Sequence, residues 1–419
     1  MNQDPAREAN RYDVIVVGAG HAGVQVVTEL IQGRFVGRIA VLDGAEHMPY
    51  ERPPLSKGFL VGDIARDEIA LRNADFWEHD QIDLRLGELL VSVDPAERVV
   101  TLRSGHTLSY RHLVWCAGGA PRPIPLPGAD LTGVHQLATL TDSETLRDEL
   151  RHGQRLVVVG GGYIGLEVAA AATRLGVTVT LLEREARLLA RVAGPEVSTF
   201  FQTLHSDEGV DIRVGIEVAG LVDDGQGKVS GVQLADGETI PADCVLVAIG
   251  LQPHVDQLAA AGAEIHDGVL VDELCRTTLK GVLAVGDCAR FPMDSTTTAR
   301  LESINNAVEQ AKVAAAQILN QELAMAYRPR PWFWSHQYDT KFRSVGLSAG
   351  HDRRIVRGDP ASSEFSVVYL RDNRAIAIDC INAMKDFVDA RKSVLGSHVD
   401  VGLIPQPGIR LADAVITDD

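Results

Sequence analysis

The stretch LVVVGGGYIGLEVAAAATRLGVTVTLLE, from Leu156 to Glu183, decides the fold. Its first apolar run, Leu156–Val159, predicts a buried strand, and a second apolar run, Val177–Leu182, predicts another. Between them, Tyr163–Leu175 has the composition of a helix, which Gly176 is expected to end. Strand, helix and strand in this order indicate a βαβ unit.

The turn between the first strand and the helix carries the pattern G-x-G-x-x-G at Gly160, Gly162 and Gly165. In such a turn the first glycine permits the sharp bend, the second lets backbone approach a pyrophosphate, and the third lets the helix pack on the strand. The helix N-terminus offers N–H groups and a positive dipole to the phosphates. Glu183 follows after about 20 residues, where a ribose-binding acid belongs. The stretch therefore predicts a dinucleotide site.

A second copy of the pattern opens the chain as RYDVIVVGAGHAG, Arg11 to Gly23, with glycines at 18, 20 and 23. Two copies indicate two dinucleotides, usually FAD at the N-terminal copy and a nicotinamide at the internal one. Asp43 follows the last glycine by about 20 residues and is the corresponding acid. Around this copy we expect a strand at Tyr12–Val17, a helix at His21–Ile31 and a strand at Arg38–Leu42.

The chain has 419 residues, enough for two or three domains, and its 45% hydrophobic and 23% charged residues are ordinary for a soluble globular protein. A net charge of −17 argues against nonspecific nucleic-acid binding, and no apolar run reaches the length of a membrane span. The five cysteines form no C-x-x-C pair or metal-binding spacing, which favours a reducing cytoplasm and argues against disulfides and metal sites. Met1–Ala9 lacks the pattern of a signal peptide and is expected to be a loose tail.

Two runs are the expected crossings between the nucleotide-binding parts: LVWCAGGAPRP (Leu113–Pro123) and VLVAIGLQP (Val245–Pro253). The predicted fold class is therefore α/β, with a Rossmann-like NAD-binding domain at 121–246 inserted into a Rossmann-like FAD-binding domain at 1–120 and 247–326. Residues 327–419 predict a third, mixed α+β domain. The further elements expected are strands at Glu88–Val93, Val99–Leu102, Tyr110–Cys116, Ser344–Leu347, Phe365–Leu370 and Ala375–Ile381, and helices at Glu302–Leu319 and Ala383–Leu395.

Two short segments carry candidate ligand residues. PYERPPLSK, which ends at Lys57, is stiffened by prolines and contains Arg52 and Lys57, so it suits an anionic ligand or is simply a solvated loop. In LCRTTLKGVLAVGDC, Leu274–Cys288, Asp287 follows an expected buried strand and a glycine. Its carboxylate can accept hydrogen bonds from the ribityl hydroxyls of FAD, and a turn aspartate is the alternative.

The charge balance changes near the C-terminus, because residues 327–419 are nearly neutral and the rest of the chain carries the negative charge. A neutral-to-basic face on an acidic protein suits an acidic partner, although ordinary variation in composition is the alternative. The basic candidates are Lys341, Arg343, Arg353, Arg354 and Arg357, with Arg300 from the FAD-binding part.

Five motifs together resemble the FAD-dependent ferredoxin reductases of bacterial oxygenase systems, of the putidaredoxin reductase, biphenyl-dioxygenase reductase and rubredoxin reductase types. The resemblance covers the chain from Tyr12 to about Asp413 and implies a glutathione-reductase-like fold. The motifs are RPPLSK (Arg52–Lys57), GGGYIGLE (Gly160–Glu167), AVGDCARF (Ala284–Phe291), RLESINNAVEQA (Arg300–Ala311) and PWFWSHQY (Pro331–Tyr338).

The resemblance implies a role for many residues. Lys57 would lie beside the flavin N5 and pair with Glu167 as the catalytic pair, and Trp334 would lie near the flavin and the electron exit. No metal site is implied. The residues implied for FAD are Gly18, Gly20, Ala22, Gly23, Asp43, Arg52, Lys57, Leu90, Ala117, Gly118, Asp287, Glu302, Ile304 and Trp334. Those implied for NAD are Gly160, Gly162, Tyr163, Ile164, Gly165, Glu167, Glu183, Arg191 and Gly250.

The sequence departs from the family pattern at four places. The ribose acid usually stands where this chain has Gly44, so Asp43 is shifted by one position. The turn that is usually ATG is Cys116–Ala117–Gly118, and a frequent arginine is Ala138. His336 replaces a carboxylate in the W-S-D-Q motif, a change that can alter partner choice or make reduction sensitive to pH.

Related disulfide reductases carry a C-x-x-x-x-C pair where this chain has a proline-rich segment without cysteine. Electrons must then leave the flavin without a protein dithiol. The resemblance implies hydride transfer from NADH to FAD and single-electron transfer to an acidic 2Fe–2S ferredoxin that feeds an oxygenase. Glu183 favours NADH over NADPH, because a carboxylate repels a 2′-phosphate, although Arg184 and Arg187 nearby weaken that preference.

Two other interpretations stay open at this point. One is a flavin reductase of rubredoxin, a quinone or monodehydroascorbate. The other is a redox-sensing interaction protein similar to apoptosis-inducing factor. The basic C-terminal face and the lack of targeting segments favour the electron-transfer component, as a monomer or homodimer.

Overall fold

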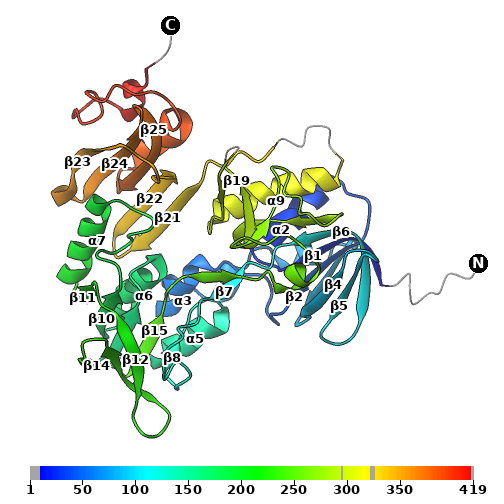
Figure 1. The fold of residues 1–419 in the computed structure, drawn as a ribbon, viewed down its shortest axis with the longest axis horizontal. Coiled ribbons are helices and arrows are strands. Elements are labelled where there is room, and N and C mark those ends of the chain that lie inside the picture. The colour runs from blue at the N-terminus through cyan, green and yellow to red at the C-terminus, as the bar shows by residue number, and fades with distance from the viewer. Residues whose placement is uncertain (1–9, 294–295, 321–325, 417–419) are drawn as a thin grey trace, which may run out of the picture. The chain divides into compact units, whose positions relative to one another are not determined.

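The computed structural model describes residues 10–293, 296–320 and 326–416, which form two compact units (Figure 1). The first unit comprises the described residues up to Glu51, Arg66–Ala120 and Leu251–Pro331. The second comprises Arg52–Ala65, Pro121–Gly250 and the chain from Trp332 onward. The expected tail Met1–Ala9 lies outside the described residues.

The first unit is built on one mixed sheet. Its order is β3-β2-β1-β6-β5-β4, with β18 also paired to β6. The pairs among β3, β2, β1, β6 and β18 are parallel, and β4-β5-β6 are antiparallel. The strands are β1 (Arg11–Val17), β2 (Ile39–Asp43), β3 (Ile82–Leu86), β4 (Leu90–Asp94), β5 (Val99–Leu102), β6 (Thr107–Trp115) and β18 (Val282–Ala284).

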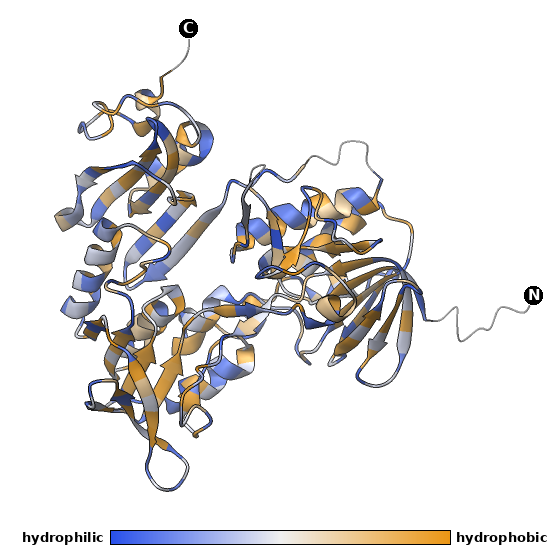
Figure 2. Cartoon of the chain, viewed as in Figure 1, coloured by the Kyte–Doolittle hydropathy of each residue, from blue (hydrophilic) through white to orange (hydrophobic). Residues whose placement is uncertain are grey.

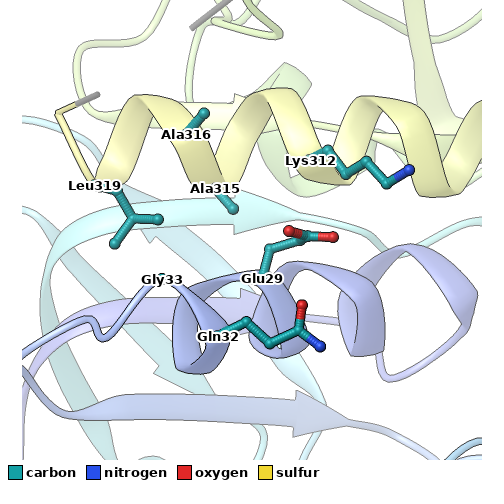
Figure 3. A pocket seen from close by; sticks show the side chains of 7 residues that line it. All are labelled: Glu29, Gln32, Gly33, Lys312, Ala315, Ala316 and Leu319. Atoms are coloured by element: carbon teal, nitrogen blue, oxygen red, sulfur yellow. The ribbon is translucent and has the colours of Figure 1, made fainter. Parts of the chain in front are cut away.

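Two helices, α2 (His21–Gln32) and α9 (Ile304–Ile318), pack side by side on one face of this sheet (Figure 1). Small residues let them approach: a Cβ on Gly33 would lie 2.4 Å from a methyl group of Leu319. A groove of about 250 Å³ runs between their C-terminal ends, and its lining residues are drawn in Figure 3. Because these ends are remote from the glycine turn, the groove is not assigned a cofactor.

Shorter elements complete the first unit. The strands β7 and β16 of the two expected crossings pair with each other, so the chain leaves and re-enters this unit at adjacent places. The elements are η2 (Asp67–Ile69), α4 (Ala74–Trp77), β7 (Gly119–Pro121), β16 (Leu251–Pro253), α8 (Asp256–Ala260), β17 (Val269–Leu270), η3 (Gly286–Cys288), β19 (Ala289–Pro292) and β20 (Thr298–Ala299).

The second unit holds a parallel sheet in the order β11-β10-β9-β15-β8, whose strands are largely hydrophobic in Figure 2. One apolar core lies between this sheet and a three-stranded antiparallel sheet, β12-β13-β14. The elements are β8 (Val134–His135), α5 (Leu140–Glu149), β9 (Arg155–Val159), α6 (Tyr163–Arg174), β10 (Thr178–Glu183), α7 (Pro195–Asp207), β11 (Asp211–Val214), β12 (Val218–Asp223), β13 (Val229–Leu234), β14 (Thr239–Pro241) and β15 (Cys244–Val247).

The strand, helix and strand expected from Leu156 to Glu183 are β9, α6 and β10, so the fold class predicted from this stretch is confirmed. Gly176 takes φ +74° just after the last turn of α6, a conformation that only glycine adopts without strain. The first copy of the pattern likewise forms β1, α2 and β2. In these two stretches the predicted ends differ from the observed ends by at most one residue, whereas the strand expected at Ser344–Leu347 begins four residues earlier, at Thr340.

The same unit contains an antiparallel sheet in the order β21-β22-β25-β24-β23. Neither β21 nor β23 was anticipated, because β21 has three consecutive aromatic residues followed by three polar ones and β23 is rich in arginine. The helix expected at Ala383–Leu395 is shorter and ends in a π-helical segment. The elements are β21 (Trp332–Gln337), β22 (Thr340–Gly346), β23 (Arg353–Asp359), β24 (Glu364–Arg371), β25 (Arg374–Ile381), α10 (Met384–Asp389) and the π-helical segment Ala390–Val394.

This sheet packs on α6 and α7 through alternate residues of its strands. Phe333 stacks on Tyr163 of α6 with ring centroids 4.2 Å apart, whereas Trp332 and Trp334, the residues on either side of it, stack on each other. Because successive side chains of a strand point to opposite faces, β21 presents one set of residues to α6 and the other away from it. The division of this unit into an NAD-binding domain at 121–246 and a C-terminal domain at 327–419 stays a prediction.

A buried carboxyl group joins β25 to the start of α7. Asp379 is 2% exposed and accepts a hydrogen bond of 2.7 Å from the hydroxyl of Tyr369, which in turn accepts one of 2.9 Å from the N–H of Gly194. Burial raises the pKa of Asp379 to about 6, and these hydrogen bonds limit the rise. The folded protein therefore holds a desolvated carboxylate above about pH 6.

We expect Asp379→Asn to change how stability depends on pH. The raised pKa means that the folded wild type takes up a proton as pH falls through 6, which the amide cannot do, so the wild type gains stability relative to the variant by on the order of 3 kcal/mol between about pH 7 and pH 4. Thermal midpoints at a series of pH values measure the difference. Asp372→Asn, at an exposed turn, is the control; parallel pH curves for wild type and Asp379→Asn would contradict the expectation.

Candidate active site

The first glycine turn leaves space at the N-terminus of α2. A Cβ on Gly18 would lie 2.4 Å from the carbonyl oxygen of Cys116, and one on Gly23 would lie 1.9 Å from the carbonyl oxygen of Gly18. A Cβ on Gly20 would meet no atom within 4 Å. The first and third glycines are therefore required by the fold, whereas the second keeps a place open for a ligand phosphate.

The internal turn repeats this arrangement. A Cβ on Gly160 would lie 2.3 Å from the carbonyl oxygen of Ala248, and one on Gly165 would lie 2.1 Å from the carbonyl oxygen of Gly160. At Gly162 a Cβ would again meet nothing within 4 Å. Neither α2 nor α6 has a side-chain cap at its first turn, so both helix N-termini can receive a phosphate.

The two acids expected to bind ribose, Asp43 and Glu183, occupy equivalent positions. Asp43 accepts hydrogen bonds from the N–H groups of Ala19 (2.6 Å) and Ala45 (2.8 Å), one on each carboxylate oxygen. Glu183 accepts from Gly161 and Glu185 in the same way, both at 2.7 Å. Each oxygen can accept a further hydrogen bond from a ribose hydroxyl. The carboxylate of Asp43 therefore has the same position relative to its glycine turn as that of Glu183.

Other residues expected for FAD gather around α2. Gly286 has φ +81° and places the segment of Asp287 against this helix, since a Cβ there would lie 3.1 Å from the Cβ of Ala22. The side-chain oxygen of Gln310 accepts a 2.7 Å hydrogen bond from Gly286 and fixes that approach. Ile304 is the first residue of α9. These residues fit a dinucleotide that lies along the first glycine turn.

The structure places four further residues that were expected to bind FAD. Leu90 is 3% exposed and belongs to the apolar core, so its side chain is mostly covered before any adenine binds. Ala117 and Gly118 follow the end of β6, and the carbonyl of Gly118 accepts a 3.0 Å hydrogen bond from the N–H of His254. Arg52 is exposed and precedes the 3₁₀ helix η1 (Pro53–Ser56).

Arg300 is a structural residue of the first unit. Its guanidinium is 9% exposed and donates to the carbonyl of Asp287 at 3.1 Å and to Glu302 at 2.8 Å. It also lies 3.5 Å from Asp267. A side chain so enclosed contributes little to an exposed basic face, which corrects its place among the docking candidates.

The structure brings together residues expected for NAD. A Cβ on Gly250 would lie 3.7 Å from the guanidinium of Arg191. Ile164, in the first turn of α6, is 46% exposed, an unusual position for an isoleucine and one that suits contact with a ligand. Tyr163, beside it, is partly covered by Phe333, and burial raises the pKa of its phenol.

Arg187, which the sequence placed near Glu183 as a possible counter-charge, is held by hydrogen bonds within its own loop. Its guanidinium donates to the carbonyls of Ala193 (2.7 Å) and Ala190 (2.9 Å) and to the hydroxyl of Ser198 (2.6 Å). It is therefore committed to its own loop. Arg184 is 79% exposed and lies 3.5 Å from Glu185.

A buried ion pair is the centre of the second unit. The Nζ of Lys57 lies 2.6 Å from Oε2 of Glu167, and the two side chains are 22% and 5% exposed. Lys57 stands where η1 meets α3 (Gly58–Val61), so the segment expected to be a proline-stiffened or solvated loop contains a 3₁₀ helix at its end. The hydroxyl of Ser143 on α5 donates to the carbonyl of Leu55 at 2.8 Å and holds this segment.

Two serines that were not singled out in the sequence complete the pair. Ser56 donates to Oε2 of Glu167 and Ser335 donates to Oε1, each at 2.5 Å, while Lys57 also donates to the carbonyl of Pro53 at 3.1 Å. A buried ion pair recovers its desolvation cost only when its other hydrogen-bonding positions are filled. Both serines lie inside quoted motifs, but nothing in their spacing indicates a shared partner.

Cations surround His336, which replaces the family carboxylate. In the β21–β22 register His336 lies opposite Lys341, and Trp334 lies opposite Arg343. Burial, followed by Arg343, Lys57 and Lys341, lowers the pKa of His336, and Glu167 opposes that effect. The imidazole is therefore neutral at pH 7, and this edge of β21 carries no negative charge at position 336.

The thiols are unsuited to redox exchange. All five cysteines are buried and none forms a disulfide. Burial raises the pKa of Cys244 and of Cys288 to about 12, so both stay protonated. Among the described residues no group of His, Cys, Asp and Glu side chains is placed to hold a metal ion. No described helix has the length and apolar character needed to cross a membrane.

Comparisons with known proteins agree with this geometry. Residues 12–311 match the family model described as pyridine nucleotide-disulphide oxidoreductase, and residues 332–411 match that described as reductase C-terminal. A ferredoxin–NAD(P)+ reductase of Sphingomonas sp is 46% identical over 389 residues, which cover 91% of this chain and 92% of the relative. The 5,5′-dehydrodivanillate O-demethylase ferredoxin reductase subunit of Sphingobium sp. is 44% identical over 408 residues, 96% of each chain.

A solved structure is similar over most of the chain. The crystal structure of the covalent putidaredoxin reductase–putidaredoxin complex matches with a TM-score of 0.90 and 38% identity, covering 96% of this chain and 96% of that chain.

The two kinds of glycine in the internal turn give opposite expectations. Gly162→Ala should leave the thermal midpoint of the protein unchanged and weaken NAD⁺ binding by roughly tenfold or more, because the added methyl group fills the place open for phosphate. Gly165→Ala should lower the thermal midpoint, because its methyl group would meet a backbone oxygen at 2.1 Å. Calorimetric titration and thermal unfolding measure both. Unchanged NAD⁺ affinity in Gly162→Ala would refute the assignment.

Proposed function

Because the chain belongs to the pyridine nucleotide-disulphide oxidoreductase family, and within it to the FAD-dependent ferredoxin reductases, we propose that it transfers electrons from NADH through FAD to a 2Fe–2S ferredoxin that feeds an oxygenase. Bound FAD supplies the ability to accept a hydride and to release electrons one at a time. The observation that carries the proposal is the buried Lys57–Glu167 pair in a chain whose cysteines are all buried and unpaired.

Lys57 is proposed to present its ammonium group to the flavin N5. A cation there favours the reduced, anionic flavin, and Glu167 keeps the lysine charged and directed. The contacts of Glu167 with Ser56 and Ser335 support this role, because they hold the carboxylate in one orientation. The peptide carbonyl of Pro53 limits the freedom of the ammonium further.

NADH is the proposed donor rather than NADPH. The carboxylate of Glu183 is held by the turn at Gly161 and repels a 2′-phosphate at that position. Arg187 is occupied within its own loop, so it offers no counter-charge to such a phosphate. Arg184 is the exposed cation that remains near.

An acidic ferredoxin is proposed to bind the basic residues of the C-terminal sheet. Lys341, Arg353 and Arg354 are exposed, although Arg354 also pairs with Glu196 at 3.2 Å. Arg343 is partly buried beside Phe387. Arg357 is held by Asp386 at 3.0 Å and by loop carbonyls, so it is left out of the proposed face. Trp334 is the proposed residue at the electron exit.

Anaerobic mixing of NADH-reduced protein with a panel of 2Fe–2S ferredoxins tests the function. We expect reduction of at least one ferredoxin, a rate that falls as ionic strength rises, and a much larger kcat/KM for NADH than for NADPH. NADH–ferricyanide activity, which needs no protein docking, should change little with salt. Transfer only to rubredoxin or quinones, or a long-lived reduced flavin that reduces no acceptor, would support one of the other functions instead.

Lys57→Met should slow the reduction of the flavin by NADH by roughly tenfold or more in anaerobic stopped-flow measurements, because the charge next to N5 is lost while the volume is kept. Lys280→Met removes an exposed lysine in the first unit and should leave the rate unchanged. Equal rates for Lys57→Met and wild type would exclude Lys57 from the chemistry.

A further inference from the structure

A line of buried polar side chains begins at Oε1 of Glu167, the carboxylate oxygen that does not touch Lys57. Ser335 donates to this oxygen at 2.5 Å, and Ser335 accepts a hydrogen bond of 3.1 Å from the side-chain amide of Gln337. The amide oxygen of Gln337 lies 2.8 Å from Nε2 of His205. We call Ser335, Gln337 and His205 the Ser335 chain. Its three side chains are at most 1% exposed, so no bulk water can replace a lost partner.

The hydrogen bonds of the Ser335 chain can run in one direction only. A carboxylate only accepts, so the single hydrogen of Ser335 must point to Glu167, and its oxygen must accept from Gln337. The amide oxygen of Gln337 then accepts from Nε2–H of His205, which leaves Nδ1 to accept from the hydroxyl of Tyr338 at 3.3 Å. Every donor therefore points toward Glu167, and such aligned hydrogen bonds strengthen one another.

This direction requires a neutral His205. Burial lowers the pKa of its imidazole, and the hydrogen bond to Gln337 opposes that effect less strongly. A neutral ring with hydrogen on Nε2 is the one form that donates to Gln337 and accepts from Tyr338. The histidine at the far end therefore fixes the orientation of the amide, and the amide fixes the orientation of the serine.

The Ser335 chain links three elements of the second unit. Glu167 lies on α6, the helix of the internal glycine turn, while Ser335 and Gln337 are alternate residues of β21 and His205 is in α7. Alternate residues of a strand share a face, which explains how two positions of one motif reach the same helix pair. The carboxylate of Glu167 is thereby held by Ser335 of β21 as well as by Ser56 and Lys57.

We propose that Ser335 is a positioning residue for the reaction: it holds the carboxylate of Glu167 ionised and turned so that Oε2 faces Lys57, and Gln337 and His205 act through it. This rests on the proposed function of the Lys57–Glu167 pair and adds the residues that determine its geometry. Without Ser335, Oε1 loses its hydrogen-bond donor in a place 5% open to solvent, and the ionised form of Glu167 becomes more costly.

The pH profile of flavin reduction separates this role from simple packing. The titratable groups that face Glu167 are Lys57, Tyr163 of its own helix and His336 of β21. Ser335→Ala should move the acid limb of the profile upward by about one pH unit, so that the rate below the limb falls about tenfold. Ser335→Thr keeps the hydroxyl and should restore the wild-type profile. Ser362→Ala, at an exposed 3₁₀ turn, is the matched control.

A double-mutant cycle tests whether Gln337 acts through Ser335. Gln337→Leu alone should shift the acid limb in the same direction as Ser335→Ala. In the S335A background, Gln337→Leu should not shift the acid limb further, because the serine hydroxyl that Gln337 orients is gone. Additive shifts would show that Gln337 does not act through Ser335 and would overturn that part of the proposal. His336→Gln should leave the shift caused by Ser335→Ala in place; loss of that shift would assign the limb to His336 and overturn the proposal.

Nuclear magnetic resonance of ¹⁵N-labelled histidine gives a measurement independent of turnover. The resonances of His205, identified by their absence in His205→Gln, should show a neutral ring protonated on Nε2 at about pH 7. A ring protonated on Nδ1, or a charged ring, would overturn the direction inferred for the hydrogen bonds of the Ser335 chain.

Comparison with Lys57→Met separates the role of Ser335 from the role of the Lys57–Glu167 pair. Ser335→Ala is compared only if it has full FAD content and the wild-type thermal midpoint. If such a variant keeps the wild-type pH profile while Lys57→Met slows flavin reduction, the role of Ser335 is refuted and the role of Lys57 stands. If Lys57→Met has no effect, the proposed function of the pair fails. A profile that shifts equally in Ser335→Ala and Ser335→Thr would also overturn the inference, since the hydroxyl would then not matter.

Discussion

One buried carboxylate organises the second unit. Glu167 is 5% exposed and receives hydrogen bonds from Ser56, Lys57 and Ser335, which come from two distant parts of the chain. A buried carboxylate requires donors from the protein, because their hydrogen bonds replace the hydration that the group gave up. The requirement therefore holds the proline-rich segment, α6 and β21 together. It also directs the lysine ammonium, so the same contacts that stabilise the packing prepare the site.

The two dinucleotide turns show how repetition of a local pattern gives repetition of geometry. In each turn the first and third glycines face backbone oxygens, the second faces open space, and an acid at the end of the next strand is tied to the N–H within the turn. The one-residue shift of Asp43 relative to the family pattern is absorbed by this arrangement. The chain returns through β15 and brings Gly250 next to Arg191, which lies in the loop between β10 and α7.

The sequence predicted the elements with strong periodicity and the residues with a fixed spacing. The strand, helix and strand from Leu156 to Glu183 and the pairing of Lys57 with Glu167 were anticipated, the first from residue patterns and the second from family resemblance. The strand β21 was missed, because its sequence shows no simple alternation: Phe333, Ser335 and Gln337 contact α6 and α7, and Trp332 and Trp334 stack on the other face. Ser56 and Ser335 were missed because a hydroxyl has no sequence signature for its partner. Arg187 and Arg300 were given roles on charge alone, and only the structure shows that their guanidinium groups are already held.

The separation of the three donors along the chain also affects how the protein is made. The hydrogen bonds to Glu167 join residues 110, 111 and 168 positions apart. During synthesis the segment of Ser56 and Lys57 leaves the ribosome first, and Ser335 follows on the order of tens of seconds later. For much of that time Glu167, the partner of Ser56 and Lys57, has not yet been made either. Long-range contacts of this kind slow folding. The contacts of Glu167 can thus be completed only after β21 has been made, and a chain truncated before β21 lacks one of the donors that fix this buried charge.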